Sequence, residues 1–172
     1  MKSVPYALAV GSLMYTMFAT WPDNTHVIGV VSKFMHNPGR SHWNAVKHVF
    51  RYLVGTKDHG ILFGPNKKIG LVGYTDSDFV GCVDSRKSTT GYCFKFGNGA
   101  ISWKSKLQEC TTTSTTEVEY VATSDAGKEA LWLDELAHTF RQVDSDLAPV
   151  VYSDNQGVVV LSKNSPQCLQ EY

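Results

Sequence analysis

Two similar segments, far apart in the sequence, constrain the fold of this chain most strongly. One apolar run reaches an aspartate in Leu71-Val72-Gly73-Tyr74-Thr75-Asp76, and another does so in Val150-Val151-Tyr152-Ser153-Asp154. If the two runs are parallel neighbouring strands, about 4.8 Å apart, their terminal aspartates lie side by side. Ligands of open α/β sheets bind at the carboxyl ends of strands. The pair therefore predicts a site at one edge of a sheet.

A long helix is predicted between these two strands. Ser114 followed three residues later by Glu117 is a capping box, which is typical of a helix N-terminus. Apolar residues then recur at helical spacing as far as Leu136. Glu119 lies in the first turn and a half of this helix. We expect it to lean over the same sheet edge as the two aspartates.

The remaining elements of this part fit the same fold class. Strands are predicted at residues 71–75, 91–96 and 100–104, the last two joined by a Gly97-Asn98-Gly99 turn. A strand at 149–153 and a short helix at 156–163 follow the long helix, and a further short strand is predicted at 61–63. The order β-β-β-α-β-α indicates the α/β class, with helices packed on a mixed sheet.

The first third of the chain is predicted to be helical. One helix covers residues 6–18, a second is capped by Asn24 or Thr25, and a third is capped by Ser41 and ends at Gly55. Residues 4–21 carry no charge, which also occurs in signal peptides, but polar residues and a proline interrupt them and favour a buried helix. We expect two parts, a helical segment at 1–66 and an α/β domain at 67–172.

Composition excludes several classes of protein. The 172 residues are 42% hydrophobic and 12% aromatic, which excludes a disordered chain. The net charge is zero, but residues 1–106 carry 13 Lys and Arg against 5 Asp and Glu, and residues 107–172 carry 3 against 11. The basic part is suited to a polyanion and the acidic part to cations or solubility. The four cysteines show no disulfide or zinc-site spacing.

Three converging carboxylates repel one another unless protons or divalent cations neutralise them. Oxygen ligands of this kind suit Mg²⁺ or Mn²⁺, and two such ions can activate water against a phosphodiester. The simpler interpretations remain open at this point. Asp76 and Asp154 are each read as a turn former or helix cap, and Glu119 as a solvated helix residue. Asp78 is a rival ligand, whereas the capping box already explains Glu117.

Basic, hydroxyl and aromatic side chains are candidates for contact with nucleic acid. The loop between the first two strands offers phosphate partners, a tryptophan beside two lysines offers a stacking surface, and a serine begins the long helix. For each, a solvated loop, a half-buried strand position or a helix cap is the alternative. The candidates are Arg86, Lys87, Ser88, Thr89, Trp103, Lys104 and Ser114.

Several sequence runs resemble the C-terminal part of the Pol polyprotein of copia-type LTR retrotransposons, in particular those of plants. The runs occur in the same order and cover nearly the whole chain. The resembling runs are Val4-Pro5-Tyr6-Ala7, Ala9-Val10-Gly11-Ser12-Leu13-Met14-Tyr15, His42-Trp43 through Arg51-Tyr52-Leu53 to Gly55-Thr56, Gly73-Tyr74-Thr75-Asp76-Ser77-Asp78, Arg86-Lys87-Ser88-Thr89-Thr90-Gly91-Tyr92, Ser102-Trp103-Lys104-Ser105-Lys106, Ser114-Thr115-Thr116-Glu117-Val118-Glu119-Tyr120 and Ser153-Asp154-Asn155-Gln156.

The resemblance implies a fold and an activity. Residues 1–66 correspond to the thumb- or connection-like tail of the reverse transcriptase, and the rest to an RNase H-like domain that cuts the RNA strand of RNA–DNA hybrids. The family's catalytic and metal-binding carboxylates fall on Asp76, Glu119 and Asp154, with two Mg²⁺ or Mn²⁺ ions. The implied partners are the hybrid and the rest of the Pol polyprotein, and the implied location is a cytoplasmic virus-like particle, without a membrane.

The match fades at Asn164. In the family a further strand and a last helix follow, and that region carries a fourth acidic ligand. We therefore expect this domain to be incomplete at its C-terminus. Two functions remain open from sequence: a metal-dependent ribonuclease H, and a catalytically inactive relic that acts at most as a nucleic-acid-binding or interaction module.

Overall fold

The computed structural model describes residues 4–61, 70–82, 84–140 and 148–163. The chain forms two compact units, Met1–Leu62 and Phe63–Tyr172, and each is described here by itself. The boundary predicted after residue 66, most of the strand predicted at 61–63, and the end of the resemblance at Asn164 lie outside the described residues. These three points stay predictions.

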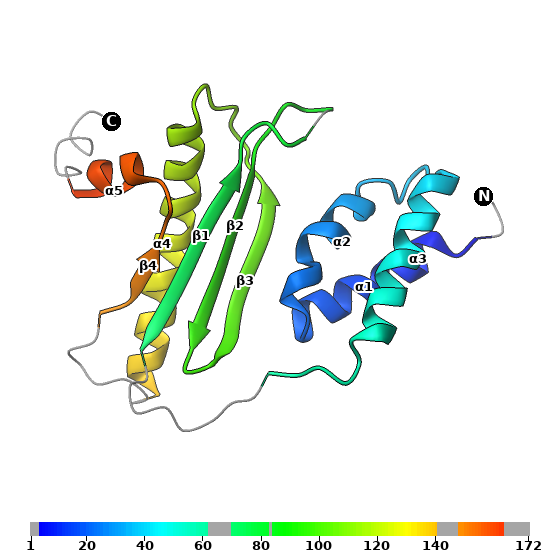
Figure 1. Cartoon of the computed structure of the whole chain (residues 1–172), viewed down its shortest axis with the longest axis horizontal. Helices are drawn as coiled ribbons and strands as arrows, with labels where there is room; N and C mark the ends of the chain where they lie inside the picture. Colours follow the sequence, from blue (N-terminus) through cyan, green and yellow to red (C-terminus); the bar gives the residue numbers. More distant parts are fainter. Residues whose placement is uncertain (1–3, 62–69, 83, 141–147, 164–172) are drawn as a thin grey trace. The chain divides into compact units, whose positions relative to one another are not determined.

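The first unit is helical. It contains α1 (Tyr6–Ala19), the 3₁₀ turn η1 (Pro22–Asn24), α2 (Thr25–Ser32) and α3 (Arg40–Gly55), as Figure 1 shows. The three α-helices bury one face each in a common core, and the Tyr6 hydroxyl donates to the Val31 carbonyl at 2.8 Å. The uncharged run near the N-terminus is thus a helix with one buried face. Among the described residues, no helix is long and apolar enough to cross a membrane.

The starts of two helices differ from the sequence prediction. The Ser41 cap is wrong, because α3 begins at Arg40 with Gly39 as its N-cap, two residues before Ser41, and the Gly39 N–H donates to Nδ1 of His42 at 2.9 Å. Asn24 is the N-cap residue of α2, as one of the two predicted alternatives had it, but its side chain makes no capping hydrogen bond because the chain enters α2 directly from η1. At α3 an imidazole takes the place of the expected hydroxyl cap, and at α2 the preceding 3₁₀ turn takes the place of a side-chain cap.

The second unit is built on a four-stranded mixed sheet. Its strands are β1 (Leu71–Asp78), β2 (Thr89–Phe96), β3 (Gly99–Leu107) and β4 (Val150–Tyr152), in the order β3-β2-β1-β4. The first three strands are antiparallel, and β4 is parallel to β1. Gly97 takes a positive φ of 61°, which the tight turn between β2 and β3 requires. The strands predicted at 71–75, 91–96, 100–104 and 149–153 are confirmed. β1 to β3 are longer than predicted, and β4 is shorter.

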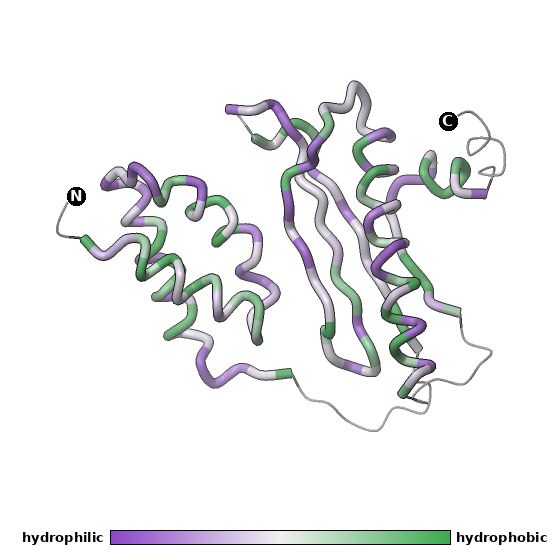
Figure 2. The backbone as a smooth tube through the Cα atoms, turned by 180° about the vertical axis from the view of Figure 1, so that it is seen from behind, coloured by the Kyte–Doolittle hydropathy of each residue, from purple (hydrophilic) through white to green (hydrophobic). Residues whose placement is uncertain are grey.

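A single long helix covers one face of this sheet. α4 (Thr115–Thr139) runs along β1 and β2, and α5 (Gln156–Lys163) follows β4 (Figure 1). Figure 2 shows hydrophobic and hydrophilic residues alternating along α4, as expected for a helix with one buried face. Ala126 and Ala130 let this helix approach Leu71 and Phe94 closely. The predicted α/β class is confirmed, and the arrangement is compatible with an RNase H-like fold.

Two glycines test the packing between sheet and helix. Phe94 is fully buried over Gly73, and a Cβ at position 73 would overlap its ring. We expect Gly73→Ala to reduce the free energy of unfolding by about 1–3 kcal/mol, because the core must move to accept the methyl group. Gly127→Ala is the control, since no atom lies within 4 Å of a Cβ there and alanine favours helix. It should add about 0.5–1 kcal/mol in urea unfolding. Equal effects at both positions would contradict this packing.

Candidate metal centre

The structure brings three carboxylates together at one edge of the sheet. Asp76, Glu119 and Asp154 each offer an oxygen, and these atoms all lie within 4.8 Å of one another. Asp76 belongs to β1, and Asp154 lies two residues beyond β4. Tyr74 pairs with Tyr152 in the parallel ladder, so the two aspartates occupy equivalent places on neighbouring strands. The predicted meeting of these side chains is present in the structure.

The local structure decides between the readings that sequence left open for the two aspartates. β1 continues as far as Asp78, so Asp76 lies within a strand rather than in a turn. Asp154 is not the cap of α5, because the Val158 N–H donates to Oδ1 of Asn155 at 3.2 Å. Asp76 is therefore not a turn former and Asp154 is not a helix cap, so both carboxylates are available to the cluster.

The two rival carboxylates are held elsewhere. Asp78 Oδ1 accepts the Thr89 N–H at 2.6 Å, and Asp78 does not belong to the cluster found among the described residues. Glu117 Oε2 accepts the N–H groups of Thr113 and Ser114, at 2.7 and 3.3 Å. The capping box at Ser114 is therefore confirmed, and it leaves Glu119 as the helix carboxylate that faces the aspartates.

Glu119 has an unusual environment for a carboxylate. Its side chain is buried, at 8% exposure, and no hydrogen-bond partner lies near its Oε2 among the described residues. Burial raises the pKa of Glu119, and the negative charges of Asp76 and Asp154 raise it further, against the opposing effect of the Ser77 hydroxyl and N–H. The folded chain thus holds a carboxylate that prefers a proton or a cation.

The donor set fits a hard divalent cation. All three groups are carboxylates, two of them exposed and one buried, and hard oxygen ligands suit Mg²⁺ and Mn²⁺. A cation here would compensate the repulsion between the carboxylates and supply a partner for the buried oxygen of Glu119. Asp76, Glu119 and Asp154 are therefore the residues that would hold it.

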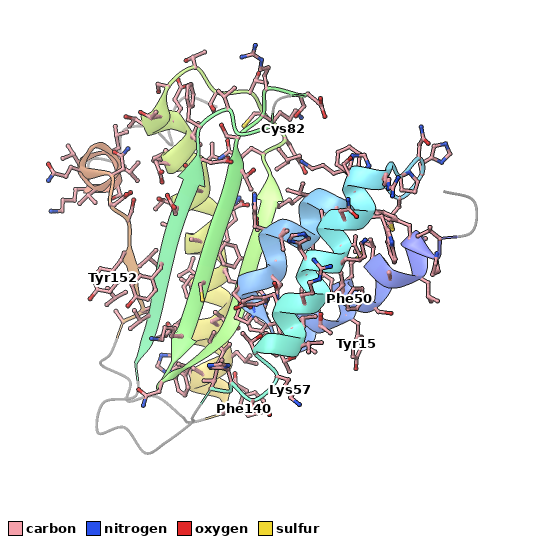
Figure 3. The ribbon with its side chains drawn as sticks, turned by 45° about the vertical axis from the view of Figure 1, so that its right-hand side comes forward. Tyr15, Phe50, Lys57, Cys82, Phe140 and Tyr152 are labelled. Carbon is pink, nitrogen blue, oxygen red and sulfur yellow. The ribbon has the colours of Figure 1, made fainter. Side chains whose placement is uncertain are left out.

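The residues predicted to contact nucleic acid are in part engaged within the fold. Lys87 Nζ donates to the Glu109 carbonyl at 2.6 Å. Ser88 is 2% exposed, and its hydroxyl accepts the Val80 N–H at 3.0 Å. Two polar side chains of this loop between β1 and β2, which carries the label Cys82 in Figure 3, are thus engaged in hydrogen bonds within the fold.

The other members of that set are spread over three elements. Arg86 is exposed, with a positive φ of 55°, and Thr89 begins β2. Trp103 is half-buried on β3, and Lys104 forms an ion pair with Asp125 at 3.0 Å. Ser114 caps α4. The contact of these side chains with nucleic acid stays a prediction.

Two polar residues of the site region were missed from sequence. The Ser77 N–H donates to Asp76 Oδ1 at 2.8 Å, and its place directly after the strand-end aspartate was the available signal. Gln108 is 5% exposed and its side chain donates to the Val118 carbonyl of α4, but nothing in its sequence context indicates a role at the site.

An aromatic pair joins the two strands that lead to the aspartates. Tyr152, labelled in Figure 3, stacks on Tyr74 with ring centroids 5.6 Å apart.

The chain is similar to several known proteins. It is 52% identical over 165 residues to the "Retrovirus-related Pol polyprotein from transposon TNT 1-94" of Nicotiana tabacum, covering 96% of this chain and 12% of that polyprotein. It is 40% identical over 159 residues to the corresponding protein "from transposon RE2" of Arabidopsis thaliana, covering 92% of this chain and 11% of that protein. The chain thus spans about an eighth of the length of these relatives.

A third relative has a different name. The chain is 48% identical over 133 residues to "Secreted RxLR effector protein 161" of Plasmopara viticola, covering 77% of this chain and 94% of that protein. No protein-family model and no solved structure matches the chain.

Because the pKa of Glu119 is raised in the folded chain, ionisation of this carboxyl group lowers the free energy of unfolding. The folded chain binds this proton more tightly than the unfolded chain does, so stability falls as pH rises from about 4 through the raised pKa. Without divalent cations, Glu119→Gln should therefore be more stable than the wild type at pH 7, and the difference should shrink towards pH 4. Urea unfolding midpoints between pH 4 and pH 8 measure this.

Glu117→Gln is the matched control for that experiment. Hydrogen bonds from Thr113 lower the pKa of Glu117, so its ionised form stabilises the folded chain above the ordinary carboxyl pKa. The control variant should thus be less stable than the wild type at pH 7, the opposite sign. A Glu119→Gln variant that loses stability at pH 7, as the control does, would contradict the described environment.

Proposed function

Because the chain belongs to the retrovirus-related Pol polyproteins of copia-type transposons, we propose that its second unit is a metal-dependent ribonuclease H that acts on the RNA strand of RNA–DNA hybrids. The carboxylate cluster supports this proposal most directly. Asp76, Glu119 and Asp154 converge within 4.8 Å, and the buried Glu119 oxygen has no partner among the described residues. Such an arrangement is costly to a fold unless a cation completes it.

The buried glutamate and the two exposed aspartates have different roles in this proposal. Glu119 is buried and fixed on α4, so it holds a cation at a defined depth, whereas the exposed Asp76 and Asp154 leave the outer side open to a phosphate. When bound, two Mg²⁺ or Mn²⁺ ions would activate a water molecule and stabilise the leaving oxygen of the phosphodiester. No nucleophilic side chain is needed.

Binding of the nucleic acid would rest on basic side chains of both units. Described residues 4–61 carry five Lys and Arg against two Asp, and the loop with Arg86 lies in the second unit. Contacts to phosphates supply affinity, and the 2′-hydroxyls distinguish the RNA strand. We further propose that the first unit is the tail of a reverse transcriptase, that the rest of the Pol polyprotein is the partner, and that the complex acts in cytoplasmic virus-like particles.

A second candidate is a binding or interaction module without catalysis. The match to the relative named a secreted effector favours it, because that protein is matched over 94% of its own length and its name includes no polymerase. Ion pairs already engage Lys104 and Lys106, which lowers the positive charge free for phosphates. This candidate predicts hybrid binding that depends on salt, is indifferent to Mg²⁺ and leaves the RNA intact.

Cleavage of an end-labelled RNA strand in a hybrid separates the two candidates. The wild-type chain should cut it with Mg²⁺ and not with EDTA. Asp76→Asn should reduce the rate about 100-fold or more, since a metal centre supplies several kcal/mol of transition-state stabilisation. Circular dichroism and urea unfolding should show that this variant remains folded.

Asp84→Asn is the matched control, as it removes an exposed carboxylate of the loop that lies outside the cluster. It should cleave at the wild-type rate. Equal cleavage by Asp76→Asn and the wild type would reject the assignment, and binding without any cleavage by the wild type would favour the second candidate.

A further inference from the structure

We propose that Gln108 is a positioning residue that fixes Glu119 against Asp76. The inference rests on the proposed function and extends it to a residue outside the carboxylate cluster. Gln108 directly follows β3 and is 5% exposed. Its backbone N–H donates to the Ser88 carbonyl at 2.8 Å, which holds the residue against the start of β2.

The side-chain amide of Gln108 joins two elements. Nε2 donates to Thr90 Oγ1 and to the Val118 carbonyl, both at 3.0 Å. Thr90 and Val118 are 2% and 1% exposed, so water does not replace either bond. A single NH₂ group carries the two hydrogens that a hydroxyl and a carbonyl acceptor require. The amide thus ties β2 to the first turns of α4.

Both ends of this tether lie next to the carboxylates. Val118 immediately precedes Glu119 on α4. Thr90 pairs with Ser77 in the β1–β2 ladder, and the Ser77 N–H donates to Asp76. Gln108 therefore links the backbone beside Glu119 to the backbone beside Asp76 through two buried hydrogen bonds and one strand pair.

At Glu119 itself, the Ser77 hydroxyl and N–H of β1 also act on the carboxylate. Two further polar contacts between the described parts of sheet and helix lie further along α4. Lys104 pairs with Asp125, and Ser102 donates to Glu129. The apolar cluster likewise holds the helix through Ala126, Ala130 and Leu133. These contacts fix the middle of α4 on the sheet, whereas the Gln108 amide acts within one residue of Glu119. Loss of this amide should thus increase the mobility of the Glu119 backbone more than it lowers the stability of the whole fold.

The test is a double-mutant cycle on the full chain. Gln108→Leu keeps the volume and removes both donors, Thr90→Val removes one acceptor with little change of shape, and the third variant combines them. Calorimetry with Mg²⁺ alone should give a dissociation constant raised roughly 10-fold in Gln108→Leu, as is typical for a residue that orients a metal ligand. Thr90→Val should weaken binding in the same direction, and the double variant should equal Gln108→Leu, because both act through one tether.

Ser102→Ala is the matched control, as it removes a sheet-to-helix bond ten residues from Glu119. It should lower the thermal midpoint without changing the dissociation constant. In the cleavage assay, high Mg²⁺ should restore the rate of Gln108→Leu but not that of Asp76→Asn. A dissociation constant within twofold of the wild type for Gln108→Leu, or the same rise in Ser102→Ala, would overturn the proposal.

A metal-free readout separates this proposal from the proposed function. A wild-type chain that binds no Mg²⁺ would contradict the proposed function alone. Amide hydrogen exchange without metal should still be faster at Glu119 and Tyr120 in Gln108→Leu than in the wild type, and unchanged at Ala130. Equal exchange at all three amides would overturn the positioning role whatever the metal result.

Discussion

Mutual repulsion of three carboxylates is the constraint on which the rest of the second unit depends. Oxygens of Asp76, Glu119 and Asp154 lie within 4.8 Å, and one of the three side chains is buried. Like charges at this separation move apart unless the backbone that carries them is rigid, and charges that are held together favour a bound proton or cation. Two features of the unit supply that rigidity: the hydrogen-bonded pairing of β1 with β4, and the packing of α4 on β1 and β2.

These two features have different physical origins. Asp76 and Asp154 are aligned by main-chain pairing, since the parallel register of β1 and β4 brings Tyr74 beside Tyr152 two residues before each aspartate. Glu119 is aligned by packing, because small alanines bring α4 close to Phe94 and the Gln108 amide fixes its first turns. One carboxylate from a helix, one from a strand and one just beyond a strand therefore meet through contacts that are distant in the sequence.

Sequence patterns predicted the four described strands, the long helix and the convergence of the three carboxylates, because the signals for each lie within a few neighbouring residues. Apolar runs ending in aspartate, a capping box and a glycine turn are each encoded within a few residues, and the structure contains all of them. The N-cap position of α2 agrees with the prediction of Asn24, but the 3₁₀ turn before Thr25 replaces its side-chain bond. The cap of α3 was mispredicted because Gly39 and the imidazole of His42 take the place of Ser41. Gln108 escaped detection because its role depends on residues 10 and 18 positions away, which spacing does not reveal.

The energetic cost of the cluster bears on the choice between enzyme and inactive relic. Burial and neighbouring charge raise the pKa of Glu119, so its ionised form destabilises the folded chain in the absence of a cation. Replacement of any one of the three carboxylates relieves that repulsion, and a chain without a need for the metal would gain stability from it. This chain carries all three, with the buried oxygen of Glu119 held towards the aspartates and supported by a dedicated amide. A metal centre requires this costly arrangement and its support, whereas a binding module without catalysis requires neither.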